Sequence, residues 1–136
     1  MSIVGIAGPT KTAVFARLTG NATLMTAVSN RIYDEVPEGT LSYPYVQLGE
    51  TFETKDSTFD ADGRQVLMWV HVWSQYKGDK EANAILAQIG DLLDEYALSV
   101  TGASVMTCDV EMAQVTRDND GKTRHGKLDL RVRLSE

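Results

Sequence analysis

The chain has 136 residues, the length of one ordinary domain, and 43% of them are hydrophobic, which is enough for a core of its own. Its formal net charge of −6 argues against a domain that binds nucleic acid by neutralising phosphates, because such domains are usually basic. A single cysteine excludes an intrachain disulfide, and no apolar run reaches the roughly 20 residues of a membrane helix.

The first part of the chain is predicted to be mainly helical. Residues 9–28 carry apolar positions near helical spacing, Gly20 interrupts them, and Asn21 is a favourable N-cap for the second piece. Residues 1–9 lack the basic start of a signal peptide and are expected to form a flexible N-terminus. Residues 31–42 contain proline and glycine and are expected to be a connector.

Two strands are predicted next, over residues 43–52 and 64–76, and an acidic loop at 53–63 is expected to protrude between them. Alternation in the first strand assigns one face to Val46, Leu48 and Phe52. The second strand is apolar or aromatic on both faces, which indicates a central strand covered on two sides. One of its faces carries Val66, Met68, Val70 and Val72, and the other carries Leu67, Trp69, His71 and Trp73.

The second half of the chain is predicted to be a helix over residues 80–98 and a hairpin over residues 105–134. Apolar residues of the helix recur every three or four positions, while its other face, which includes Glu81, is expected to meet water. Asp120 and Gly121 indicate the turn of the hairpin. Alternation assigns the core side of its first strand to Met106, Cys108, Val110 and Met112.

The predicted fold class is α+β, with the element order α-β-β-α-β-β in a single domain over residues 1–136. Two hairpins are expected to form one antiparallel four-stranded sheet, and the helices are expected to cover its apolar face as a two-layer sandwich.

Two motifs come close to known ligand-binding loops but lack essential residues. Residues 5–12 match a phosphate-binding loop except that Thr10 replaces the second glycine. Residues 58–63 and 116–121 resemble calcium loops, but both begin with threonine and lack the glutamate at the twelfth position. We therefore expect the protein to bind no nucleotide, no metal ion and no other cofactor.

The residues best suited to catalysis are His71, His125 and Cys108. Their spacing does not indicate a dyad, although spacing alone says nothing about distance in space. Two histidines and one cysteine are also too few for a typical structural zinc site. The sequence therefore predicts no catalytic residues, and the protein is not expected to be an enzyme.

The second face of the central strand needs a cover for Trp69, His71 and Trp73. Either the N-terminal helix or the 31–42 connector folds over these side chains, or a neighbouring subunit does, since tryptophan is enriched at interfaces. We expect them to belong to an oligomer interface together with Phe59, which lies on the protruding loop.

The order of several short motifs resembles a known family. A run at residues 22–28, an R-I-Y-D-E-V-P string at 31–37, Y-P-Y-V at 43–46 and V-H-V-W-S at 70–74 together resemble the tail-completion, or tail-terminator, proteins of long-tailed bacteriophages. The resemblance extends over about residues 10–136. It implies a structural protein that forms a ring, usually a hexamer, on the head-proximal end of the tail tube, and it supplies no catalytic residues.

The resemblance also implies the partners of the chain. These are other copies of itself, the tail tube protein and the head–tail connector or stopper protein; DNA would pass through the channel without specific binding, and no membrane is involved. The expected location is the virion tail, after assembly in the host cytoplasm. The alternatives are a head-closure or stopper protein of the connector and a small non-enzymatic α+β binding module.

Overall fold

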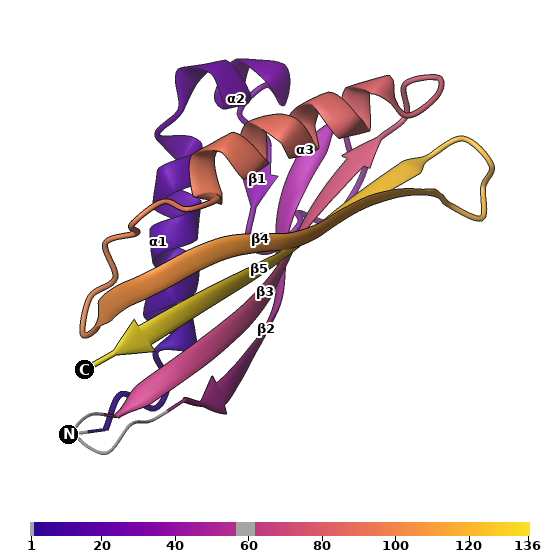
Figure 1. Cartoon of the computed structure of the whole chain (residues 1–136). Helices are drawn as coiled ribbons and strands as arrows, with labels where there is room; N and C mark the ends of the chain where they lie inside the picture. The colour runs from indigo at the N-terminus through magenta and orange to yellow at the C-terminus, as the bar shows by residue number, and fades with distance from the viewer. Residues whose placement is uncertain (1, 57–61) are drawn as a thin grey trace.

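The computed structural model describes residues 2–56 and 62–136, which form a twisted five-stranded sheet with three helices on one side (Figure 1). From one edge of the sheet to the other, the strands are β1 (Ile32–Tyr33), β2 (Tyr45–Lys55), β3 (Gly63–Ser74), β5 (Arg124–Ser135) and β4 (Ser104–Arg117). The helices are α1 (Ala7–Thr19), α2 (Ala22–Ala27) and α3 (Lys80–Leu93). Within the described residues, none of the helices combines the length and apolar character needed to cross a bilayer.

The predicted fold class is wrong because the sheet is mixed and has a fifth strand. β1 runs parallel to β2, with Ile32 opposite Val46. It has only two residues, too few for any alternation to be visible, so the sequence does not distinguish it from the 31–42 connector. The element order is therefore α-α-β-β-β-α-β-β and not α-β-β-α-β-β.

Hydrogen bonds of Arg31 connect the two ends of the segment 34–42. Its backbone carbonyl accepts a hydrogen bond of 2.9 Å from the Val46 amide. Its guanidinium donates from Nη2 to the carbonyl of Tyr43 at 2.8 Å and from Nε to that of Pro44 at 2.9 Å. The two ends of this largely exposed segment are thus held together beside β1.

The core lies between the helices and one face of the sheet. The helical spacing predicted for α3 is confirmed, since its apolar stripe is buried, and β3 is confirmed as the central strand. The helix ends at Leu93, before the predicted residue 98, and Tyr96 beyond it is exposed. Fully buried side chains from both layers include Val14, Leu18, Ile89, Leu93, Val66, Val70, Leu128, Leu130 and Val132.

Bulges reverse the alternation in both β2 and β4. The pairing of β2 with β3 shifts by one residue between Leu48 and Thr51, so Phe52 lies opposite Leu67 on the far side of the sheet and is 57% exposed. Similar shifts in β4 leave Met106 and Met112 exposed while Cys108 remains buried. The prediction that Phe52 shares a face with Val46 and Leu48 is wrong, and so is the prediction that both methionines face the core, because each extra residue moves the later side chains to the other face.

The bulge in β2 needs a glycine at position 49. A β-carbon there would lie 2.6 Å from His71 Nε2 and 2.9 Å from the backbone oxygen of Trp69. We expect Gly49→Ala to lower the free energy of unfolding by about 1–3 kcal/mol, as overpacking commonly does. The control is Gly90→Ala in α3, where no atom lies within 4 Å and alanine should stabilise the helix by roughly 0.5–1 kcal/mol. Urea denaturation of both variants tests whether the two substitutions change the free energy of unfolding in opposite directions. A Gly49→Ala protein as stable as the unsubstituted protein would contradict the tight contact.

Candidate functional site

The face of the sheet opposite the helices, here called the open face, carries no helix in the described part of the chain (Figure 1). α1 and α2 both contact α3 on the other side of the sheet, so the alternative in which the N-terminal helix covers this face is wrong. The side chains of the open face come from alternate positions of four strands. They include Tyr45, Phe52, Leu67, Trp69, His71, Trp73, His125, Lys127, Asp129, Arg131 and Met112.

Aromatic rings stack across three strands at one end of the open face. Trp73 lies opposite Tyr45 on β2 and opposite His125 on β5. Its ring is 6.4 Å from that of Tyr45 and 4.0 Å from that of His125, with an angle of only 2° to the imidazole. Tyr33 and Tyr43 extend the cluster at its β1 side. The indole Nε1 of Trp73 finds no hydrogen-bond acceptor among the described residues, although it is buried.

The structure brings His71 and His125 together, which the sequence analysis did not foresee. The Nδ1 atom of His71 lies 2.7 Å from the Nε2 atom of His125, so one nitrogen donates to the other. Burial is the main reason why the pKa of each imidazole lies below its usual value. Lys127 lowers the pKa of both further, whereas Glu50 and Asp129 raise that of His71 and Asp118 raises that of His125.

This histidine pair makes stability depend on pH. A histidine with a lowered pKa in the folded state binds fewer protons than in the unfolded state, so its contribution is present above about pH 6.5 and is lost as the pH falls toward the folded pKa. We expect the thermal midpoint to drop between about pH 7.5 and 5.5, and to drop less in His125→Gln, which removes one of the two titrating imidazoles. An equal drop in both proteins would show that the pair does not titrate as described.

Charged side chains surround Trp69 in the middle of the open face. Lys127 Nζ lies 5.2 Å from the centre of the Trp69 ring and 3.8 Å from Asp129 Oδ1. Arg131 forms an ion pair with Glu111 of β4. The buried Oδ1 atom of Asp129 accepts no hydrogen bond from the described residues. Aromatic side chains surrounded by a polar rim are typical of a protein–protein interface.

The structure places the predicted interface residues as follows. Trp69, His71 and Trp73 occupy alternate positions of β3 on the open face, and all three are partly buried. Phe59 lies outside the described residues. Tyr45, His125 and Lys127, which the sequence does not predict at this interface, join them from the two neighbouring strands. Only the register between strands could have identified these neighbours.

The sequence matches the family described as Tail completion protein gp17 over residues 12–135. The chain belongs to this family of phage tail completion proteins. It is 30% identical over 93 residues to the tail completion protein gp17 of Bacillus phage SPP1, covering 68% of this chain and 69% of that protein. The resemblance read from the sequence is thereby confirmed.

Solved structures show the same likeness. A chain of the virion of a native gene transfer agent particle is 26% identical, with a TM-score of 0.91 and coverage of 98% of this chain and 99% of that one. The structure of bacteriophage SPP1 gp17 is 27% identical, with a TM-score of 0.62 and coverage of 93% and 88%. The tail completion family is a structural one.

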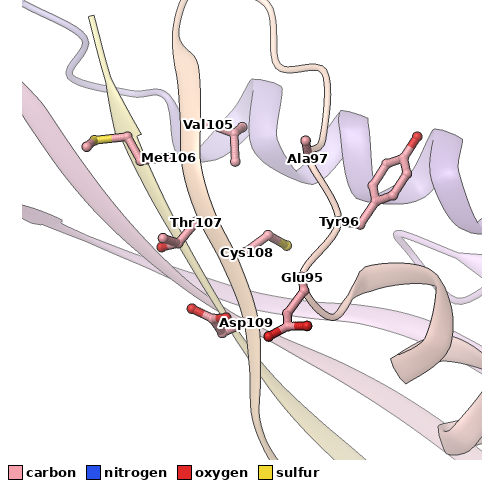
Figure 2. A pocket seen from close by; sticks show the side chains of 8 residues that line it. All are labelled: Glu95, Tyr96, Ala97, Val105, Met106, Thr107, Cys108 and Asp109. Carbon is pink, nitrogen blue, oxygen red and sulfur yellow. The ribbon is translucent and has the colours of Figure 1, made fainter.

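This tail completion family member also has a shallow groove beside β4 (Figure 2). It has a volume of about 310 Å³ and lies between residues 95–97 and residues 105–109. Cys108 points toward residues 95–97, but it is only 2% exposed, and burial is the main reason why its pKa is raised to about 12. The thiol is therefore protonated near neutral pH and a poor nucleophile. Elsewhere in the described residues, no group of three or more His, Cys, Asp or Glu side chains is placed to hold a metal ion.

Proposed function

We propose that the chain is a structural subunit that forms a hexameric ring at the head-proximal end of a phage-type tail tube. The ring ends growth of the tube and joins the tail to the head. The observation that carries this proposal is the open face, where Trp69, His71 and Trp73 stand on the central strand without a helix above them. Membership of the tail completion family and the likeness to a chain of a gene transfer agent virion support it.

The proposed contact between subunits includes the open face. Tryptophan contributes strongly to interfaces because it buries a large apolar surface with little loss of conformational freedom. A neighbour would also supply hydrogen-bond partners for Trp73 Nε1 and Asp129 Oδ1, which form no hydrogen bond among the described residues. Phe59 belongs to the same proposed contact as part of the segment between β2 and β3.

Ring closure explains how such a subunit would stop a polymer. A contact between two different surfaces of neighbouring copies closes into a ring when the rotation is suitable. One side of the ring would bind the last ring of tube protein, while the other would present a different surface to the head–tail connector. DNA would pass through the ring, and the formal charge of −6 would limit its binding. The proposed location is the virion tail, after assembly in the host cytoplasm and without a cofactor.

The proposal is tested by adding the purified protein to tube protein during polymerisation. We expect the mean tube length, measured by negative-stain electron microscopy, to fall as the amount of the chain rises. Tubes should also carry a ring with a central hole at one end only. Unchanged tube lengths with no density at either end would refute termination, whereas binding to connector rings alone would favour the head-closure alternative.

A further inference from the structure

The sheet has two edges that lack a neighbouring strand within the described residues. At one edge, β1 pairs only with Val46 and Gln47, so β2 is unpaired on its outer side from residue 48 onward. At the other edge, β4 is the last strand. Its first half is covered, because Glu95 donates its amide to the Cys108 carbonyl at 2.7 Å and the Val110 amide donates to Asp94 at 2.9 Å. Unpaired strand edges bind other strands readily.

Alternation identifies which backbone groups point outward at each edge. In β2 the Val46 amide faces β1, so the one-residue shift after Leu48 turns residues 51, 53 and 55 outward. In β4 the Val110 amide faces outward, and the shift before Met112 turns residues 113, 115 and 117 outward. Both edges therefore contain a short regular stretch after a bulge, 51–55 in β2 and 112–117 in β4. The two stretches are similar in length.

Each of the two edges also carries an exposed apolar side chain. Phe52 lies at the β2 edge of the open face and is 57% exposed, and Met112 lies at the β4 edge of the same face and is 44% exposed. Each is an apolar side chain with no cover on its outer side. The tip of the hairpin that joins β4 and β5 projects at one end of the sheet, where it can reach another molecule (Figure 1).

We infer that neighbouring copies join edge to edge, with residues 112–117 of β4 from one copy adding to residues 51–55 of β2 in the next. This inference rests on the proposed ring and specifies how its subunits are connected. Successive antiparallel pairings make β4 run opposite to β2, so the two edges can join as an antiparallel pair. Because the two stretches lie toward opposite ends of the sheet, neighbouring copies are displaced along the strands, which are then tilted relative to the ring axis. Because the two edges differ, the contact repeats around a ring. It also covers Phe52 and Met112 at the borders of the open face.

Cysteine crosslinking of assembled rings tests this contact. Thr54 and Gln114 both project from the open face, so the Thr54→Cys/Gln114→Cys double variant should give a ladder of covalent oligomers with a thiol linker shorter than about 8 Å. Within one copy β3 and β5 separate the two strands by about 14 Å, and the two positions also lie several residues apart along the sheet, which prevents internal linkage. Cys108 is only 2% exposed and should not react. The matched control, Thr54→Cys/Ala113→Cys, places its thiols on opposite faces and should give little ladder.

The outcomes separate this inference from the function on which it rests. Rings seen by electron microscopy that give no ladder with the first pair, or equal ladders with both pairs, would overturn the edge-to-edge contact and leave the ring intact. Absence of any ring on tube ends would overturn both. As a second measurement, Ala113→Pro removes an outward amide without removing a bond to β5, so it should fold normally and fail to assemble. Normal ring formation by this variant would also overturn the contact.

Discussion

Truncation of Leu86 to alanine is expected to lower the free energy of unfolding by about 2–5 kcal/mol, a large part of a typical total of roughly 5–15 kcal/mol. Leu86 is 4% exposed in the middle of α3. It packs against β5 at Gly126, where even an added β-carbon would lie 3.1 Å from its Cδ1 atom. Because glycine has no side chain that could move into the space, the cavity should persist and the loss should lie in the upper part of that range.

The control for Leu86→Ala is Asn83→Ala, an exposed position of the same helix. Glu81 is unsuitable, although the sequence places it on the solvent face. The structure shows that its carboxylate accepts a 2.8 Å hydrogen bond from the hydroxyl of Ser74, which is fully buried. Urea denaturation should separate Leu86→Ala clearly from Asn83→Ala, and equal midpoints would mean that the buried face of α3 is assigned incorrectly.

The double variant Trp69→Ala/Trp73→Ala is expected to keep its helix content and lose its assembly. Rings should disappear, and tails should grow to uncontrolled lengths without joining heads. Both indoles are partly buried within the subunit, so the surface left for a neighbour is smaller than that of two free side chains. At ~25 cal/mol per Å², covering it is worth on the order of 1–4 kcal/mol for each contact, and a ring repeats the contact at every subunit.

Far-UV circular dichroism and electron microscopy of tails test this variant. Tyr76→Ala, at an exposed position beyond the end of β3, is the control and should assemble normally. If the double variant unfolds, the tryptophans belong mainly to the subunit's own core. Trp69→Ala alone, which leaves the stack of Trp73 on His125 in place, should then still fold and fail to assemble. Folded variants that end their tails at normal length would contradict the terminator proposal itself.

The parts of the fold that could be predicted are those set by local spacing. The buried stripe of α3 follows a repeat of three or four residues, and the two faces of β3 follow simple alternation. The Asn21 cap is also local, and its side chain accepts a 2.9 Å hydrogen bond from the Leu24 amide. The family could be recognised because short motifs occur in the right order along almost the whole chain.

The parts that could not be predicted depend on pairing between distant segments. A bulge shifts the alternation of a strand by one residue. Gly49 is a local sign of the bulge before Phe52, but no such sign precedes Met112. The histidine pair of the open face joins residues 54 positions apart, and it exists only because Trp73 and His125 are paired across β3 and β5. The interaction surface could therefore be foreseen along β3 but not across the sheet.

The bonds made by Arg31 have a practical consequence. The guanidinium of Arg31 donates hydrogen bonds to the carbonyls of Tyr43 and Pro44. The two ends of the segment 34–42 are therefore held close together on the domain. The entropy of closing a flexible loop grows only slowly with its length, so extra residues there should leave the sheet undisturbed. A short peptide epitope or a fluorescent label inserted in this segment would let the copies in a single particle be counted one by one.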